Sequence, residues 1–263
     1  MRNVREADFD PIARAVVAVG TDYPSDHQLG WHSHRRAQLL YGATGLMQVD
    51  TEQGSWTVPP HRAVWIPAGT PHAVRMLGVS TRSAYIEPSA CIGMPEHCQV
   101  LHVSALMREL LMRAVDMPPH YEEAGRDGLA MALLLAELRA LPALPLHLPL
   151  PRDPATLRAR CRDFLARPAQ SESAERWARD LNVSPRTLTR LFQRETGMSF
   201  LAWRQRACVL SALPRLAAGD SVMAIAIDLG YDSPGAFATV FKRLLGESPS
   251  RYGRASGSSP ARP

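Results

Sequence analysis

The sequence lacks a long apolar segment, any paired-cysteine motif and nearly all lysine. No apolar run approaches the length of about 20 residues that a membrane-spanning helix needs. The N-terminal segment is polar and has no apolar core of the kind a signal peptide carries. Without C-x-x-C spacing, the cysteines are expected to be free, buried thiols in a reducing compartment, which predicts a cytosolic protein with no membrane partner. The four cysteines are Cys91, Cys98, Cys161 and Cys208.

Basic charge is scarce in the first part of the chain and concentrated in the second. Residues 1–151 carry 12 basic and 15 acidic side chains, a net charge of −3, whereas residues 152–254 carry 17 basic and 10 acidic ones, a net charge of +7. Lysine occurs once, as Lys242, and arginine, which binds phosphate at least as well, supplies the rest. The length of 263 residues suits about two domains, and the basic one is suited to bind phosphates.

One sequence pattern occurs twice in the basic part, at residues 178–185 and 226–234. In the first copy, Asn182 tolerates the left-handed backbone that ends a helix and turns the chain. Ser184 can then cap the next helix, and Pro185 suits its first position. The pattern therefore predicts two helix-turn-helix units, a shape that places a helix in a DNA groove. The second copy has Gly230, an inserted Asp232, Ser233 and Pro234.

From each Pro onward the landmarks of the two copies are 49 residues apart, and over residues 152–254 they resemble the AraC/XylS family of bacterial transcription regulators. The resemblance implies a long connecting helix, roughly Phe200–Leu216, with recognition helices near 185–194 and 234–243. It also implies double-stranded DNA as a partner and RNA polymerase as a further one. Pro214 falls inside the connecting helix, so we expect it to kink or split that helix. The landmarks are Leu188, Phe192, Arg194 and Gly197 in the first copy, and Phe237, Phe241, Arg243 and Gly246 in the second.

Side chains that lie off the apolar stripe of each recognition helix are the candidates for DNA contact. Arg186 and Arg190 are one turn apart and predict base contacts, because arginine binds guanine through two hydrogen bonds. Arg194 lies further from the start of the helix, which favours a phosphate or an acidic neighbour. The second helix has short side chains, so we expect it to contact phosphates or thymine methyl groups. The predicted contacts are Arg186, Thr187, Thr189, Arg190, Arg194, Gly235, Ala238, Thr239 and Lys242.

All nine histidines lie before residue 148, so the first part of the chain has a chemistry of its own. His32 and His34 would share one face of a strand, and Gln38 is in phase with them. A turn at 67–71 then leads to His72, and three imidazoles on neighbouring strands can converge on one divalent transition metal. Short apolar segments between Gly and Pro turns predict an antiparallel sandwich or barrel. The expected strands are Ala37–Tyr41, Leu46–Val49, Trp56–Val58 and Ala63–Ile66.

The spacing His32-x-His34-x(3)-Gln38, followed by Gly45 and by Pro67-x-Gly69-x(2)-His72, resembles the cupin motif over residues 30–75. Many AraC-type regulators carry a cupin-like sensor, and the run from His32 to Tyr41 resembles the NimR-like subgroup. Gln38 replaces the acidic ligand of the motif, and a neutral amide holds metal less firmly. Two interpretations stay open: a metal site, or a scaffold around an organic effector in the barrel interior. The predicted metal ligands are His32, His34, Gln38 and His72, and the predicted walls of the effector pocket are Trp31, Tyr41, Trp56 and Trp65.

Helical periodicity follows the predicted strands. One helix is expected to start at Ser104, and a second, over 126–141, is apolar on most sides and needs partners on more than one face. Those partners are the barrel or a second copy of the chain, and the family resemblance favours a homodimer. Five prolines between 142 and 154 indicate an inter-domain linker. The predicted segments are 1–98, a sensor barrel; 99–141, a helical dimerisation segment; 142–154, the linker; 155–254, the DNA-binding domain; and 255–263, a disordered tail.

The sequence thus predicts a multidomain α and β protein, with a cupin-like antiparallel β-barrel, a helical segment and an all-α double helix-turn-helix domain. Its predicted function is a sequence-specific DNA-binding transcription regulator that responds to a small-molecule or metal-bound effector and associates with the nucleoid when bound to DNA. The alternative is a cupin metal-dependent enzyme with an appended helical domain. The amide of Gln38 and the lack of a placed carboxylate count against this alternative, so we expect no enzyme.

Overall fold

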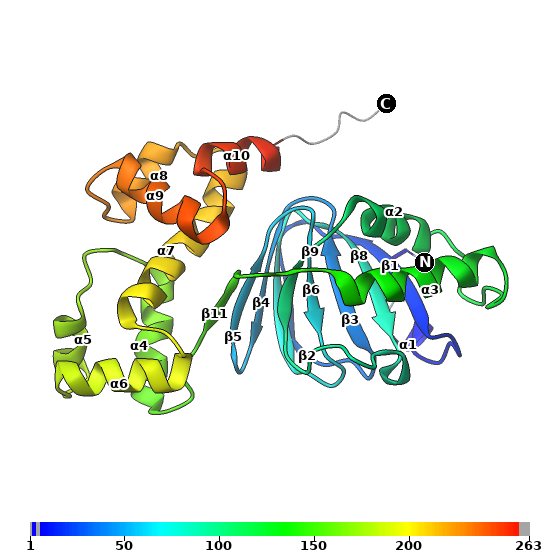
Figure 1. Ribbon diagram of the computed structural model, residues 1–263, viewed down its shortest axis with the longest axis horizontal. Coiled ribbons are helices and arrows are strands. Elements are labelled where there is room, and N and C mark those ends of the chain that lie inside the picture. The colour runs from blue at the N-terminus through cyan, green and yellow to red at the C-terminus, as the bar shows by residue number, and fades with distance from the viewer. Residues whose placement is uncertain (1, 4–5, 258–263) are drawn as a thin grey trace. The chain divides into compact units, whose positions relative to one another are not determined.

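The computed structural model describes residues 2–3 and 6–257, and the chain divides into two compact units (Figure 1). The first unit comprises Met1–Thr51 and Trp56–His147, and the second comprises Glu52–Ser55 and Leu148–Pro263. Strands dominate the first unit and helices the second. Among the described residues, none of the helices combines the length and the apolar composition that crossing a membrane would require.

Two antiparallel β-sheets form the first unit, which confirms the expectation of an antiparallel β-domain. One sheet has the strand order β1-β8-β3-β6-β9-β10, and the other has the order β11-β5-β4-β7-β2. The four strands expected between residues 37 and 66 are all present as β3 to β6. The strands are β1 Val16–Asp22, β2 Ser25–His32, β3 Ala37–Gly42, β4 Leu46–Thr51, β5 Gly54–Val58, β6 Arg62–Ile66, β7 His72–Leu77, β8 Ser80–Ile86, β9 Gln99–His102, β10 Ala143–Leu144 and β11 His147–Pro149.

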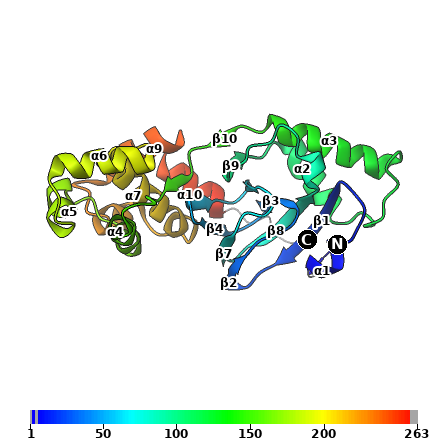
Figure 2. The same ribbon diagram turned by 90° about the horizontal axis from the view of Figure 1, so that it is seen from below.

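Side chains of β3 alternate between two interiors. Leu39 and Tyr41 belong to a core that β3 shares with α2 (Ala105–Ala114) and α3 (Arg126–Ala140), the helices that lie against the six-stranded sheet (Figures 1 and 2). Gln38 and Leu40 instead line a cavity to which both sheets contribute. Because successive side chains of a strand point to opposite faces, one strand supplies both interiors.

The boundaries of the predicted helical and linker segments need correction. β9 lies within the predicted helical segment 99–141, where it pairs with β6 and continues the first sheet. β10 and β11 lie within the predicted linker 142–154, next to β9 and β5 at the edges of the two sheets. Proline is compatible with such edge strands, because an edge residue does not need to donate a hydrogen bond to a second neighbour.

The cysteines are free, as expected, and three of them are buried. Burial raises the pKa of the Cys98 thiol to about 12, which makes it unreactive at neutral pH. Cys91 differs from the prediction because it is only partly buried, beside the short 3-10 helix Pro88–Ala90.

Within its described residues, the second unit consists mostly of seven helices. Pro214 lies in the last turn of α7, and the predicted split of the connecting helix is wrong because the helix continues to Ala217. The tail predicted from residue 255 begins inside α10, and its last six residues, 258–263, lie outside the described residues. The helices are α4 Ala155–Ala166, α5 Ala174–Asp180, α6 Pro185–Thr196, α7 Phe200–Ala217, α8 Val222–Asp228, α9 Pro234–Leu245 and α10 Pro249–Gly257.

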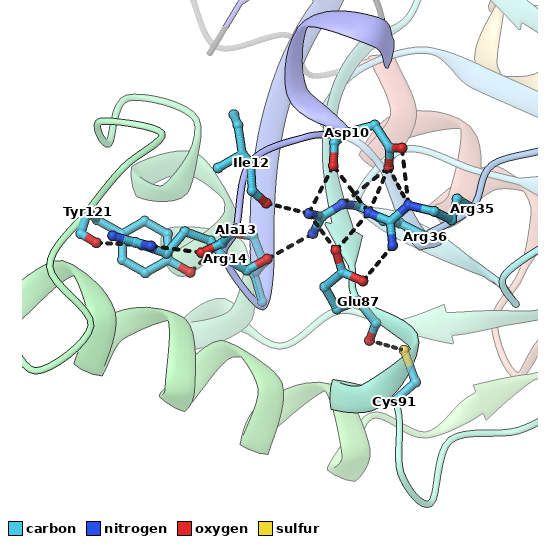
Figure 3. A network of polar contacts seen from close by, with 10 residues as sticks. Asp10, Ile12, Ala13, Arg14, Arg35, Arg36, Glu87, Cys91 and Tyr121 are labelled. Carbon is cyan, nitrogen blue, oxygen red and sulfur yellow. Dashed lines mark hydrogen bonds and ion pairs between the residues drawn. The ribbon is translucent and has the colours of Figure 1, made fainter.

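An ionic network fastens the N-terminal segment, which contains α1 (Glu6–Phe9), to the start of β3 (Figure 3). The Arg36 side chain is only 1% exposed; it contacts Glu87 at 2.6 Å and donates to the carbonyl oxygen of Ile12 at 2.6 Å. Arg35 donates to both Asp10 and Glu87. Hydrogen bonds from Arg35 are the main cause that lowers the pKa of both carboxyl groups, so Asp10 and Glu87 are both ionised at neutral pH.

We expect Arg36→Met to lower the Tm of the first unit by about 5–15 °C, because removing a buried charged partner costs about 2–4 kcal/mol. The matched control is Arg75→Met, since Arg75 is 51% exposed in its ion pair with Asp26. It should lower the Tm by no more than about 3 °C. Scanning calorimetry measures both values, and equal shifts for the two variants would contradict the structural role of Arg36.

Candidate functional site

Both copies of the repeat form the predicted helix-turn-helix geometry. Asn182 has a φ of 52° and Gly230 a φ of 72°, so each copy turns through a left-handed residue. The side chain of Ser184 accepts from the backbone N–H of Thr187, and that of Ser233 accepts from Ala236. The first helices of the two units are α5 and α8, and the second are α6 and α9. The turn and cap predictions are therefore confirmed at both sites.

The repeat extends to a pair of N-caps that were not predicted, and its two predicted glycines end the recognition helices. Ser173 and Ser221, 48 positions apart, cap α5 and α8. Gly197 and Gly246, 49 positions apart, end α6 and α9 with φ values of 69° and 81°. The change in offset places the inserted residue, Asp232, in the second turn, and both recognition helices are 12 residues long.

Aromatic side chains hold each helix pair together. Trp177, Phe192 and Trp203 are fully buried and contact one another at centroid distances of 5.7–6.0 Å. In the second helix-turn-helix, Phe237 and Phe241 are buried on the inner face of α9, and the Phe237 ring contacts that of Tyr231 in the turn at a centroid distance of 5.3 Å. Because these rings occupy the inner stripe, the opposite stripe of α6 and of α9 is left for another partner.

Most of the predicted DNA contacts are exposed. Arg186 and Arg190 are exposed on α6, and within the described part of the chain neither guanidinium group pairs with an acidic side chain. Arg194 donates to its neighbour Glu195 at 2.7 Å, which bears out one of its two expected partners. Thr187 is half-buried, and its hydroxyl contacts the capping Ser184, so it is less available. Of the other residues predicted to contact DNA, Ala238 is half-buried, and the exposed ones are Thr189, Gly235, Thr239 and Lys242.

Two exposed polar residues of the recognition helices were missed. Gln193 lies on α6 seven residues after Arg186, so it extends the Arg186–Arg190 stripe, and this spacing was the available signal. Arg243 is exposed on α9, where it donates to Gln205 at 2.7 Å. No periodic signal identifies the bond between Arg243 and α7, because it depends on how the two helices pack.

Three histidines converge at one end of the cavity in the first unit. His32 is paired with His72 across β2 and β7, and His34 follows β2. The ring centroids are 4.3–5.3 Å apart, and one donor atom from each ring lies within 4.8 Å of the others. The backbone N–H of Gly69 donates to the carbonyl oxygen of His34, which holds the predicted turn against this group. The predicted convergence is thus confirmed.

Backbone carbonyl groups orient two of the imidazoles. The Nδ1 atoms of His32 and His72 lie 2.7 and 2.8 Å from the carbonyl oxygens of Gly30 and Thr70. A carbonyl oxygen only accepts, so each Nδ1 carries a hydrogen, and Nε2 presents a lone pair whenever the ring is neutral. Burial lowers the pKa of His72 to about 4, so this ring is neutral at pH 7. Neutral rings fixed in this way are the usual histidine ligands of a transition metal.

The donor set fits such a metal at the histidines. Nε2 of His72 is buried without a hydrogen-bond partner among the described residues, as is expected of an atom that serves as a ligand. Gln38, the predicted fourth ligand, lies in the same cavity with its Nε2 held by Tyr85 and Ser83. Its Oε1 likewise has no hydrogen-bond partner in the described part of the chain. The amide oxygen is therefore available to a ligand of some kind.

The predicted aromatic walls of the pocket are wrong. Trp31 is 57% exposed, and none of the four aromatic residues lines the cavity. Tyr41 and Trp65 belong to the outer core under α2 and α3. Trp56 is buried, and its indole N–H donates to the backbone carbonyl oxygen of Cys98. The aromatic residues that do line the cavity are Phe9, Tyr23 and Tyr85.

Comparison with known proteins agrees with the helix-turn-helix geometry. A family model described as a helix-turn-helix domain matches residues 177–255. The chain is 36% identical over 222 residues to the HTH-type transcriptional regulator NimR of Escherichia coli. This match covers 84% of this chain and 81% of the relative. It is also 36% identical over 110 residues to the HTH-type transcriptional regulator RipA of Corynebacterium glutamicum, covering 40% of this chain and 33% of the relative.

These matches, together with the paired turns, define a DNA-binding transcription regulator. The chain belongs to the AraC family of HTH-type regulators. Among solved structures, that of ToxT from Vibrio cholerae O395 is 10% identical with a TM-score of 0.40, covering 93% of this chain and 99% of that one.

We expect Arg190→Ala to weaken binding to a preferred duplex by about 5- to 150-fold, because a bidentate contact to guanine is worth about 1–3 kcal/mol. Binding to random duplex should change by less than about threefold, since the loss is of one charge. Fluorescence anisotropy measures both affinities, with the preferred duplex selected from a random library by the wild-type protein.

The control is Arg162→Ala, which removes an exposed arginine from α4, outside both helix-turn-helix units. It should leave the preference for the selected duplex unchanged. An equal loss on both duplexes for Arg190→Ala would rule out base reading by this side chain.

Proposed function

We propose that this regulator senses a small molecule in the cavity between its two sheets, with a divalent transition metal held by His32, His34 and His72. The support is the histidine cluster, whose donor atoms lie within 4.8 Å of one another and whose member His72 has an unpartnered, buried Nε2. When bound, the metal would supply an electrophilic centre at one end of the cavity. The protein itself positions the three rings.

The effector would act by shifting the population of the regulator between DNA-binding states, which requires that it bind one state more tightly. The cavity is well placed for such a role, because its lining draws on five strands of both sheets and on Phe9 of the N-terminal segment. A ligand there contacts elements that are far apart in the sequence. RNA polymerase as a partner and the cytoplasm as location stay predictions.

Binding, rather than catalysis, is the role we propose for the cavity. Among the described residues that line it, none is Asp or Glu, so it offers no carboxylate for acid–base chemistry. Glu87 is engaged by both Arg35 and Arg36 outside the lining. Turnover of a cavity ligand by metal-loaded protein would favour the enzyme alternative instead.

We further propose a homodimer through α3. This helix buries Met131, Leu134 and Leu138 against its sheet but leaves Leu129 64% and Leu133 43% exposed. These two leucines are one turn apart and form an apolar face without a partner within the described chain. A second copy of the helix would remove this face from water.

The metal proposal predicts a near-stoichiometric divalent transition metal in purified wild-type protein and a loss of at least about 90% of it in the His32→Ala/His34→Ala variant, because a single imidazole holds such an ion weakly. Mass spectrometry of the metal content is the measurement. His61→Ala, at a residue outside the cavity lining, is the control and should keep the wild-type content. Equal metal in the double variant would place the ion elsewhere.

The dimer proposal predicts that Leu129→Glu/Leu133→Glu is a monomer at concentrations where the wild type is a dimer, since burying two carboxylates in an apolar interface is unfavourable. Sedimentation velocity measures the masses. Met223→Glu, at a side chain 61% exposed on α8, controls for added charge and should stay dimeric. A wild-type monomer at all concentrations would refute this interface.

A further inference from the structure

The cavity in the first unit is small and its lining carries no fixed charge. Its volume is about 170 Å³, and none of the described residues that line it is Lys, Arg, Asp or Glu. An engineered apolar cavity of about 150 Å³ binds benzene, so this one has room for about six to eight non-hydrogen atoms. A ligand that lies wholly inside it is therefore smaller than a nucleotide or a long acyl chain.

The charges nearest to the histidine cluster in sequence are already balanced. Arg35 and Arg36 directly follow His34, but both are bound to Asp10 and Glu87 (Figure 3). Two guanidinium groups and two carboxylates leave no spare charge for a ligand. In the metal-free cavity, a charged ligand would therefore lose its hydration without gaining an opposite charge from a side chain there.

Gln38 provides the directional contact in this cavity. It is 5% exposed, and its Nε2 donates to the hydroxyl of Tyr85 at 3.0 Å and to that of Ser83 at 3.3 Å. Both amide hydrogens are thereby used. Its Oε1 is buried and has no hydrogen-bond partner among the residues that the structure describes, although a buried acceptor in this state is costly. A ligand that brings an N–H or O–H group removes this cost.

We propose that the cavity of the metal-free protein binds an uncharged effector of about six to eight non-hydrogen atoms that donates a hydrogen bond to Oε1 of Gln38. This inference rests on the proposed sensing function and assigns Gln38 to effector recognition instead of metal binding. The apolar side chains of the lining, among them Leu29, Leu40 and Val74, contact the rest of the molecule.

The test uses metal-free, full-length protein at pH 7 and four probes of similar size: phenol, toluene, benzoate and benzylammonium. Calorimetric titration should show phenol binding about three- to tenfold more tightly than toluene, which is the value of one hydrogen bond between neutral groups. Benzoate and benzylammonium should bind more weakly than toluene. The inference is overturned if toluene binds as tightly as phenol, or if a charged probe binds most tightly. This result comes from the wild-type protein and does not depend on any variant.

Gln38→Met replaces the amide by an apolar side chain of similar size, and it should bind phenol and toluene equally. Leu40→Val, two residues further along the same face of β3, is the control; it should change both affinities together and keep their ratio. The metal content of Gln38→Met should equal that of the wild type. A selective loss of metal in this variant would make Gln38 a ligand of the ion and overturn the inference.

The effect of each probe on DNA binding distinguishes a failure of this inference from a failure of the proposed sensing function. The affinity for the duplex selected by the wild-type protein is measured with each probe at saturation. A change caused by phenol and abolished by Gln38→Met supports both. A change caused only by a charged probe upholds sensing by the cavity but overturns the inferred effector class. Phenol binding with the expected ranking but without any effect on DNA upholds the cavity chemistry and contradicts the sensing function.

Discussion

The alternation of side chains along β3 is the constraint on which the first unit depends. Leu39 and Tyr41 enter the core under α2 and α3, while Gln38 and Leu40 enter the cavity. A single shift of register would exchange the two sets, placing apolar bulk in the cavity and an amide under the helices. The outer core fixes this register, so the packing of α2 and α3 indirectly decides which side chains a ligand meets.

The ionic network of Arg36 serves the same architecture from the end of the strand. It ties residues 10–14 to β3 through both carboxylates and backbone carbonyl groups, and this anchors Phe9 beside the cavity. The ring of Phe9 lies 4.4 Å from that of Tyr85, the residue whose hydroxyl orients Gln38. The paired arginines and carboxylates thus stabilise this end of the fold from outside the cavity lining. The side chains that a ligand meets in the cavity therefore include none of these charged groups.

Much of the site could be predicted, but the error at the pocket walls has a simple physical origin. Trp31 directly precedes His32, and Tyr41 lies three residues after Gln38, so in a strand each points away from the cavity-facing residues. The alternation of side chains along a strand would have shown that these residues face away from the cavity. The prediction depended instead on their being aromatic, which does not indicate a direction. The hydroxyl groups that orient Gln38 come from residues 45 and 47 positions away, and no local pattern identifies them.

The sequence alone determined the two helix-turn-helix units, because their caps and turns depend on residues a few positions apart. Ser184 needs only the N–H of Thr187, and Asn182 needs only its own backbone freedom. The sequence also determined which histidines meet, since a motif fixes their spacing. Only the tertiary structure decided the size, neutrality and free acceptor of the cavity. Its lining is drawn from residues 9 to 85, and their meeting depends on strand pairing and on the packing of the two sheets.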